Sequence, residues 1–168
     1  MDVVVVRHAI AEDRETFAQS GKPDTERPLT EQGRERMQRG ARGLKQLVPH
    51  LDILATSPLV RAVETAKIIS AAYGDIEPTT VAALRPEARA QAALTWLQDQ
   101  TSDATLALVG HEPHLSMLVS WLASKSDEPF LEFKKGGACL LSFYHDIYAG
   151  GALLRWLLTP AQLRALGG

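Results

Sequence analysis

The chain begins with an apolar run that shows no alternation between apolar and polar positions. Four valines occupy positions 3–6, whereas a strand with one face in water alternates the two kinds of side chain. The range 2–6 is therefore predicted to be a strand buried on both faces, in the interior of a parallel sheet. Further short runs that predict strands occupy 51–55, 76–83 and 105–109.

Segments with helical spacing follow these runs. Between Thr30, the expected N-cap, and Pro49, small and apolar residues recur every three or four positions. Ser57 and Pro58 are expected to cap and to open the next helix. Further helices are predicted at 88–98, at 113–123 and from Pro160 onward. The polar range 12–27 is interpreted as a long surface loop.

The alternation of strands and helices predicts the fold class. A three-layer α/β sandwich is expected, with a mostly parallel sheet and helices on both of its faces. The ranges 138–145 and 152–158 flank a turn at Gly150 and Gly151, which predicts a C-terminal antiparallel hairpin at the edge of the sheet. With 168 residues, the chain is expected to form one domain over 1–168.

Composition narrows the classes of function. The net charge of -2 and the isoelectric point near 6.2 argue against a surface built to bind nucleic acid. Cys139 is the only cysteine, so neither an internal disulfide nor a thiolate metal site can form, which favours a reducing cytoplasm. The apolar run at the N-terminus is too short for a signal peptide or a membrane span, and no membrane partner is expected.

Polar residues gather at the ends of three predicted strands. Arg7 and His8 end the first strand, Ser57 and Arg61 follow the second, and His111 follows the fourth. Because ligands of open α/β sheets bind outside the carboxyl ends of the strands, these side chains are predicted to share one pocket. Guanidinium groups and the exposed N–H groups of a helix start are suited to binding phosphate.

The two histidines indicate phosphoryl transfer. A neutral histidine has one ring nitrogen free to attack phosphorus, and a second histidine, if protonated, would stabilise charge on the transferring group. The fixed cations make a metal unnecessary, so no metal and no other cofactor is expected. The motif "HEPH" places His111 and His114 around Glu112, but it is not the helical H-E-x-x-H pattern and no further metal ligand is evident.

Four segments, "RHA", "RPLTEQG", "TSPLVRAVET" and "VGHEP", resemble the histidine phosphatase superfamily, whose fold is shared with the phosphoglycerate mutases. Their spacing is most similar to that of the small SixA-type phosphohistidine phosphatases. The resemblance implies that the fold is phosphoglycerate mutase-like and that His8 is the nucleophile. It also implies that Arg7 and Arg61 clamp the phosphoryl oxygens, that His111 completes the pocket, and that Glu87 protonates the leaving group.

Other positions bear on this interpretation. Ser57 is expected either to donate to a phosphate oxygen or to act as a plain N-cap, and Arg27 is expected near the mouth of the pocket. Ala9 stands where the superfamily usually has glycine, which would impair activity if the site required a positive φ there. Arg7 could instead form a buried ion pair with Glu64.

Lys134 and Lys135 have two interpretations. They either add positive potential at the entrance for the substrate or belong to an ordinary solvated turn.

The predicted function is the removal of phosphate from phosphohistidine on a protein, without a metal, through a phosphohistidine intermediate at His8. One alternative is hydrolysis of a small phosphate ester or a mutase-like transfer. Another is a catalytically weak module that binds phosphoproteins, which Ala9 and Glu87 suggest. The expected partners are a phosphorylated protein or a small phosphate ester, with inorganic phosphate as the product, and neither nucleic acid nor a membrane.

Overall fold

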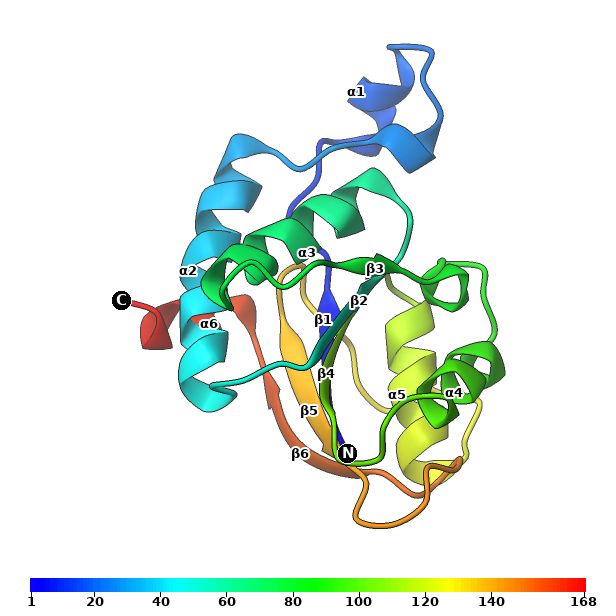
Figure 1. Ribbon diagram of the computed structural model, residues 1–168. Coiled ribbons are helices and arrows are strands. Elements are labelled where there is room, and N and C mark those ends of the chain that lie inside the picture. Colours follow the sequence, from blue (N-terminus) through cyan, green and yellow to red (C-terminus); the bar gives the residue numbers. More distant parts are fainter.

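A six-stranded sheet runs through the centre of the molecule in the computed structural model, which describes residues 1–168 (Figure 1). The strands are β1 (Asp2–Arg7), β2 (Ile53–Thr56), β3 (Thr79–Thr80), β4 (Thr105–Gly110), β5 (Ala138–Ser142) and β6 (Leu153–Leu158). They lie in the order β3-β2-β4-β1-β5-β6. The pairs β1–β4, β2–β4 and β2–β3 are parallel, whereas β5 is antiparallel to both β1 and β6.

Helices cover both faces of the sheet (Figure 1). On one face lie α2 (Glu31–Leu47), α3 (Val60–Ala72) and α6 (Pro160–Leu166), and on the other lie α4 (Ala90–Gln98) and α5 (His114–Ser124). A short helix, α1 (Arg14–Ala18), and a 3-10 turn at Asp24–Glu26 form an arm beyond the body of the sheet. The predicted α/β sandwich with an antiparallel C-terminal edge is confirmed. None of its helices has the length and hydrophobicity needed to cross a bilayer.

The valines of β1 divide between two hydrophobic cores. Val3 and Val5 pack with residues of α4 and α5, whereas Val4 and Val6 pack with residues of α2, α3 and α6, and all four are fully buried. Burying a valine side chain contributes roughly 1.5–3 kcal/mol, so both faces of β1 help to stabilise the fold. This packing fixes the position at which the chain leaves β1.

The start of α2 lies directly against the chain that leaves β1. Thr30 caps the helix, as predicted, by accepting a hydrogen bond from the N–H of Gly33 at 2.9 Å. A Cβ atom at Gly33 would lie 2.1 Å from the carbonyl oxygen of Ile10, a distance that no side chain tolerates. Glycine therefore permits the close contact that positions the segment after His8.

The range 12–27 contains more regular structure than the expected surface loop. Asp13 caps α1 by accepting a hydrogen bond from the N–H of Thr16 at 2.9 Å, and Phe17 is the buried residue of this helix. These two local interactions give the arm a defined conformation despite its polar sequence.

The strand expected at 76–83 is shorter than predicted. Only Thr79–Thr80 pair with β2, and both side chains are exposed. The chain then forms a 3-10 turn at Ala82–Leu84 that buries Val81 and Leu84 in the core shared with α4. The apolar residues of this range therefore contribute to the core through a turn and not through a strand.

Two other boundaries differ from the expectation. The helix expected to open at Ser57 begins at Val60, with Leu59 as an N-cap that has no side-chain hydrogen bond. The hydroxyl of Ser57 bonds to the ring of His111 instead. In the C-terminal pair, β5 ends at Ser142, and the range 143–152 connects it to β6 in place of a tight turn.

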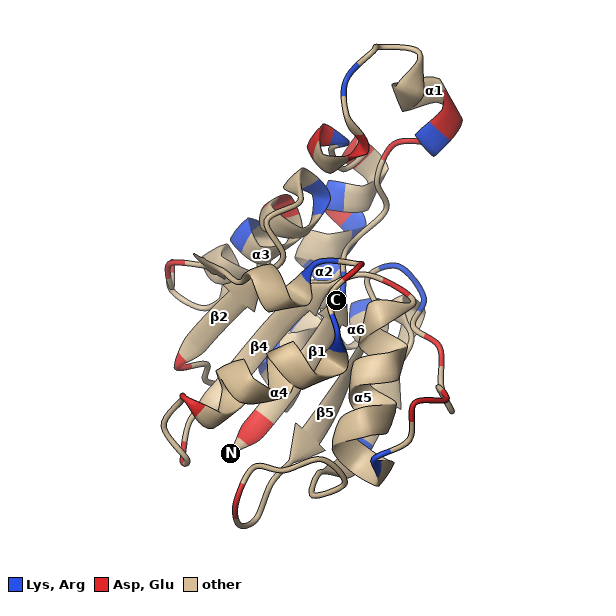
Figure 2. Ribbon diagram, turned by 90° about the vertical axis from the view of Figure 1, so that its right-hand side faces the viewer, with Lys and Arg blue, Asp and Glu red and all other residues tan.

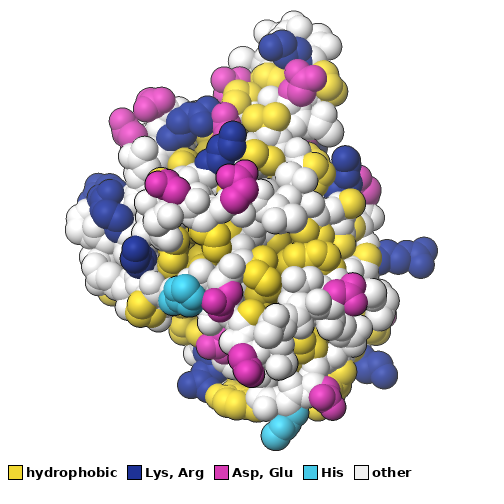
Figure 3. All heavy atoms as spheres, in the orientation of Figure 1, with side chains coloured by type: hydrophobic (Ala, Val, Ile, Leu, Met, Phe, Trp, Pro, Cys, Tyr) yellow, Lys and Arg dark blue, Asp and Glu magenta, His cyan; other side chains and the backbone are white.

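Charged residues are distributed unevenly over the elements (Figure 2). The helices α4 and α5 contain no Lys, Arg, Asp or Glu, whereas the arm and the starts of α2 and α3 carry charges of both signs. On the face shown in Figure 3, acidic and basic side chains are interspersed.

Candidate active site

A cavity of about 370 Å³ opens at the carboxyl ends of β1 and β4, beneath the arm. It brings together Arg7, His8, Arg27, Arg61 and His111, which come from distant parts of the sequence. The other lining residues are Glu12, Asp13, Arg14, Asp24, Pro86, Glu112 and Lys135. Apart from Pro86, every lining side chain is polar or charged.

His8 presents a neutral ring with a free nitrogen. Its Nδ1 lies 2.7 Å from the carbonyl oxygen of Ala9, and because a carbonyl oxygen only accepts, Nδ1 carries the proton and Nε2 keeps its lone pair. Burial lowers the pKa of His8 to about 3; the hydrogen bond to Ala9 opposes this shift, and the charges of Arg61 and Arg7 reinforce it. The ring is therefore neutral at physiological pH, as a nucleophile requires.

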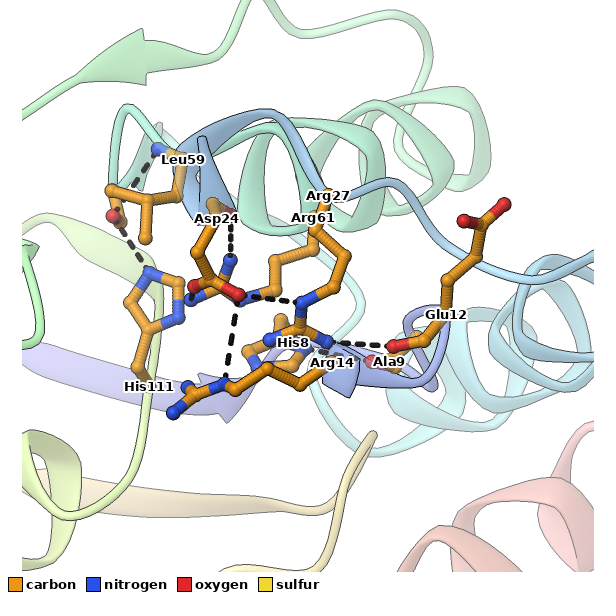
Figure 4. A network of polar contacts seen from close by, with 10 residues as sticks. His8, Ala9, Glu12, Arg14, Asp24, Arg27, Leu59, Arg61 and His111 are labelled. Carbon is orange, nitrogen blue, oxygen red and sulfur yellow. Dashed lines mark hydrogen bonds and ion pairs between the residues drawn. The ribbon is translucent and has the colours of Figure 1, made fainter. Parts of the chain in front are cut away.

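His111 lies opposite His8, with the ring centroids 5.1 Å apart. Its Nε2 is 2.8 Å from Ser57 Oγ, which also accepts from the N–H of Leu59 at 3.4 Å. The Ser57 hydroxyl has a proton to donate to Nε2, and in that arrangement the proton of the His111 ring resides on Nδ1. This Nδ1 is buried without a hydrogen-bond partner and points toward the centre of the network in Figure 4.

The protonation state of His111 follows from its surroundings. Burial lowers its pKa to about 2, and the positive charge of Arg61 acts in the same direction. In the free protein His111 is therefore a neutral hydrogen-bond donor and not the cation considered from the sequence.

Arg7 is held by the segment that precedes β5. Its guanidinium donates to the carbonyl oxygen of Phe133, and its backbone N–H donates to the carbonyl oxygen of Gly137 at 3.0 Å. The N–H of Gly136 donates to the carbonyl oxygens of Arg7 and His8, both at 3.1 Å. Arg7 Nε is buried and has no partner in the protein. The segment 133–137, of which Lys135 lines the cavity, thus holds Arg7 and His8 in place, although it is distant from them in the sequence.

Arg61 projects from the first turn of α3 and is 3% exposed. Its Nη1 donates to the backbone carbonyl of Asp24 at 2.9 Å, its Nη2 lies 3.2 Å from the Asp24 carboxylate, and its Nε is buried without a partner. The same carboxylate accepts from Arg27 Nε at 2.8 Å and lies 3.6 Å from Arg14 Nε (Figure 4). Arg27 also donates to the carbonyl oxygen of Glu12 at 2.8 Å, which fixes it at the edge of the cavity.

Asp24 is a residue of this site that the sequence did not single out. Burial would raise its pKa, but the hydrogen bond from Arg27 and the charges of Arg61, Arg27 and Arg14 outweigh that effect and hold the pKa below its ordinary value. The ionised carboxylate thus engages Arg61 in the free protein. The only feature of the sequence that could have indicated a role for Asp24 in the site is its position just before "RPLT". An acidic residue in a polar segment does not reveal which residues it contacts.

The two neighbouring lysines have different positions. Lys135 lines the cavity, where burial and the charges of Arg7 and Arg27 lower its pKa. The Lys134 side chain is 69% exposed and lies 3.9 Å from Glu132, outside the cavity. Of the two interpretations, positive potential at the entrance therefore applies to Lys135 alone.

Ala9 fits the position usually taken by glycine. Its φ is not positive, so the β-carbon causes no backbone strain. Its N–H donates to Thr65 Oγ1 at 3.0 Å, and the Thr65 hydroxyl donates to the carbonyl oxygen of Arg61 at 2.7 Å. These bonds connect the segment after His8 to α3. The loss of activity that a positive φ at Ala9 would have implied is therefore not expected.

Glu64 does not pair with Arg7. Its carboxylate accepts from Arg34 at 2.9 Å and from the N–H of Leu29 at 2.7 Å. The guanidinium of Arg7 has no acidic partner and remains available to an anion.

Two of the predicted site residues do not line the cavity. Ser57 bonds to the ring of His111 instead, and the other residue is Glu87. Its side chain is 69% exposed and lies 3.7 Å from Arg85. It faces a neighbouring cleft that His114 also lines, while Pro86 lies between the two hollows. To protonate a leaving group, Glu87 would have to move past Pro86.

Within the "HEPH" motif, Glu112 has a structural role. Glu112 accepts from the hydroxyl of Ser116 at 2.6 Å and from the N–H of Phe133 at 2.8 Å. The structure contains no group of three or more His, Cys, Asp or Glu side chains placed to hold a metal ion.

Comparison with known proteins identifies the family. Residues 3–86, which include Arg7, His8 and Arg61, match the model of the histidine phosphatase superfamily (branch 1). An uncharacterized protein of Picosynechococcus sp. (strain ATCC 27264 / PCC 7002 / PR-6) is 37% identical over 139 residues, 82% of each chain. The chain belongs to the histidine phosphatase superfamily. The resemblance to this superfamily is thereby confirmed, and three of the four segments, all but "VGHEP", lie within the matched residues. Membership of this superfamily supports a phosphatase activity.

Solved structures of other proteins share the fold. The protein histidine phosphatase SixA complexed with tungstate has a TM-score of 0.82 at 23% identity, covering 97% of this chain and 99% of that chain. A phosphoserine phosphatase of Entamoeba histolytica in complex with 3-phosphoglyceric acid has a TM-score of 0.70 at 18% identity, covering 96% and 98%. A phosphoglycerate mutase of Plasmodium falciparum has a TM-score of 0.63 at 16% identity, covering 92% and 88%. The fold of this superfamily member is therefore phosphoglycerate mutase-like, as predicted.

Proposed function

We propose that this superfamily member is a metal-independent phosphatase that removes phosphate from phosphohistidine on a protein through a phosphohistidine intermediate at His8. The proposal is supported mainly by polar atoms in the cavity that have no hydrogen-bond partner in the protein. His8 keeps a lone pair on Nε2, and three buried donors beside it, Arg7 Nε, Arg61 Nε and His111 Nδ1, have no partner in the protein. A buried donor without a partner costs about 1–3 kcal/mol, and the oxygens of a phosphoryl group would supply the missing acceptors.

The proposed reaction has two steps. The lone pair of His8 Nε2 forms a bond to phosphorus, and the bond to the leaving nitrogen breaks, so that its electron pair remains on the leaving imidazole, which takes up a proton. Water then attacks the phosphoenzyme, releases one proton to the solvent and breaks the N–P bond, which yields inorganic phosphate and neutral His8. In both steps Arg7, Arg61 and His111 would donate to the phosphoryl oxygens.

A phosphohistidine substrate agrees with the position of Glu87. The nitrogen of a phosphoramidate is basic and takes up a proton readily, so its departure depends little on a carboxylic acid. An ester oxygen would depend more strongly on such an acid, and Glu87 lies outside the cavity. We therefore expect Glu87→Gln to change the hydrolysis of a phosphoramidate by less than about twofold.

The lining of the cavity supports a large substrate of which only the phosphoryl group enters. Its polar and charged side chains offer a metabolite almost no apolar contact, whereas a protein side chain presents a phosphoryl group and leaves the rest of the molecule outside. The likeness to SixA, a protein histidine phosphatase, is consistent with this class of substrate. We propose the cytoplasm as the compartment, because the single buried cysteine requires no oxidising environment.

The nucleophile is tested by covalent labelling. Incubation with a radiolabelled phosphoramidate should give an acid-labile, base-stable label on the wild-type protein and none on His8→Asn. A label of equal amount on His8→Asn would refute the assignment. Binding of phosphate without turnover in the wild type would support the alternative of a phosphoprotein-binding module.

A small phosphate ester is the second candidate substrate, because similar folds belong to a phosphoserine phosphatase and a phosphoglycerate mutase. The value of kcat/KM should be measured for a phosphohistidine peptide, phosphoserine, a sugar phosphate and a nucleotide. A higher value is expected for the peptide. A value at least tenfold higher for one of the esters, which corresponds to about 1.4 kcal/mol, would support a small phosphate ester as the substrate instead.

A further inference from the structure

A second cleft, of about 440 Å³, adjoins the phosphate cavity. It lies between the segment 86–91 and one side of α5, and its lining includes Glu87, Ala88, His114, Met117 and Trp121. Pro86 lines both the cleft and the cavity that contains His8. A molecule that places a phosphoryl group beside His8 can therefore extend past Pro86 into the cleft.

Two residues that line the cleft have buried polar atoms without a hydrogen-bond partner in the protein. His114 is 2% exposed, and neither of its ring nitrogens has a hydrogen-bond partner. The indole N–H of Trp121 is likewise buried without a partner. Each such atom costs about 1–3 kcal/mol, which is unusual for a wall with no binding role.

The chemistry of these atoms indicates the kind of ligand. Burial lowers the pKa of His114, although Glu87 opposes the shift, so the neutral ring offers one donor and one acceptor. Trp121 offers a second donor. A backbone peptide group carries the matching pair, an N–H and a carbonyl oxygen, so an extended polypeptide segment can satisfy donors and acceptor together.

The remaining surface of the cleft suits an apolar side chain with a basic neighbour. The helices α4 and α5 carry no charged residue (Figure 2), and Met117 is 42% exposed on α5. The carboxylates of Glu87 and Asp127 outnumber the one cation among the lining residues, Arg89. Apolar contact would supply affinity, and the carboxylates would favour lysine or arginine at the edge.

We propose that this cleft binds the polypeptide segment that flanks the phosphorylated histidine of a protein substrate. An apolar side chain of that segment lies against Met117 and Trp121, its backbone bonds to His114, and a basic residue faces Glu87 and Asp127. The inference rests on the proposed function, since it concerns the substrate of the same active site. It assigns substrate recognition to residues outside the phosphate cavity.

The test uses peptides that carry a stable phosphonotriazole analogue of phosphohistidine and a fluorescent label. One peptide has leucine and lysine beside the analogue, and its partner has glycine and serine at those positions. The leucine-lysine peptide should bind the wild type about tenfold more tightly. Equal affinities for the two peptides would overturn the proposal.

Three variants locate the binding site. Met117→Glu places a charge in the apolar part of the cleft and should remove most of the preference for the leucine-lysine peptide, and His114→Phe should reduce it without adding charge. Leu47→Glu is the matched control, because Leu47 is similarly exposed, at 39%, but lies at the end of α2 on the other side of the sheet. A preference that survives both cleft substitutions, or that Leu47→Glu removes, would overturn the proposal.

Turnover separates this inference from the proposed function. If the wild type binds the analogue with the expected preference but hydrolyses no phosphohistidine peptide, the proposed function fails and the binding cleft stands. If the wild type hydrolyses phosphoramidate, and hydrolyses the two phosphohistidine peptides with equal kcat/KM, the proposed function is supported and the proposed role of the cleft is refuted.

Discussion

His8 and Arg61 have different parts in the proposed reaction, so their substitutions should reduce activity in different ways. His8→Asn removes the attacking nitrogen and should lower kcat by roughly 10³-fold or more. Arg61→Ala removes a donor to the transferring group and should lower kcat by about 10²–10³-fold, while a phosphoenzyme still forms slowly. Rapid-quench labelling distinguishes these outcomes. Arg42→Ala, which removes an exposed arginine of α2, serves as the control, and an equal loss of labelling in that variant would contradict the assignments.

Asp24 should compete with the substrate phosphate for Arg61. Its ionised carboxylate lies 3.2 Å from Arg61 Nη2, so Asp24→Asn should strengthen the binding of inorganic phosphate. The Asp24 side chain is 42% exposed, and pairs of this kind contribute below about 1 kcal/mol, which limits the gain to about fivefold. Inhibition constants for phosphate at low and high salt provide the measurement. Weaker binding in the variant would show that Asp24 positions Arg61 and does not compete.

Because the pKa values of His8 and His111 are lowered, we predict that the protein loses stability as the pH falls. Their pKa values in the folded chain are about 3 and about 2, below the ordinary value of 6.5. Below pH 6.5 the unfolded chain binds protons that the folded chain does not, so the free energy of unfolding falls as the pH drops from about 6.5 toward 3, and above that range these two groups have no effect.

Urea unfolding at about pH 7.5 and about pH 5 measures this dependence. The wild type should lose more stability between the two conditions than a His8→Gln, His111→Gln double variant. An equal loss in both proteins would assign the acid sensitivity to other groups.

The residues of the site could be predicted from the sequence only in part. Arg7, His8, Arg61 and His111 follow strand ends or helix starts, and the geometry of an open sheet brings such positions together. Asp24 lies in the arm, whose path depends on the local cap at Asp13 and on a contact with Arg61, far along the chain. No periodicity in the sequence records contacts of this kind.

At the scale of single elements, replacing two glycines of α2 by alanine should have opposite effects on stability. Gly33→Ala would place a Cβ atom 2.1 Å from the carbonyl oxygen of Ile10, and the required shift should cost about 1–3 kcal/mol and displace the segment after His8. At Gly40 the nearest atom, Leu163 Cβ, lies 4.0 Å away, so Gly40→Ala should stabilise the helix by about 0.5–1 kcal/mol. Chemical unfolding and kcat measure the two effects. Similar stability in both variants would show that the close contact with Ile10 is unimportant.

Helices and strands could be predicted where burial determines the local structure, and less well where a single contact determines it. β1 and β4 could be recognised because both faces are covered, which leaves an uninterrupted apolar run. The range 76–83 has enough apolar residues for a strand, but its one buried position, Val81, directly precedes a 3-10 turn. Ser57 satisfies the rules for an N-cap, yet its hydroxyl bonds to His111.

At the scale of the whole molecule, binding of an anion should raise global stability. Tungstate at 100 times its dissociation constant would add about 2.7 kcal/mol to the free energy of unfolding, and for a chain of this size each kcal/mol raises Tm by about 2–4 °C. A thermal shift is expected for the wild type and for Gly40→Ala. The same tungstate concentration should leave Tm of Arg61→Ala almost unchanged, and an undiminished shift in that variant would place the anion elsewhere.

The antiparallel direction of β5 has a consequence for the order in which the enzyme is made. Because β5 runs opposite to β1, its beginning lies beside the end of β1, and Phe133, Gly136 and Gly137 bond to Arg7 and His8 from there. A ribosome has therefore synthesised every residue that would contact phosphate well before it synthesises the segment 133–137, which holds Arg7 and His8 in place. A nascent chain that ends before position 133 should be inactive, and turnover should begin only after the last strands have emerged and joined the sheet.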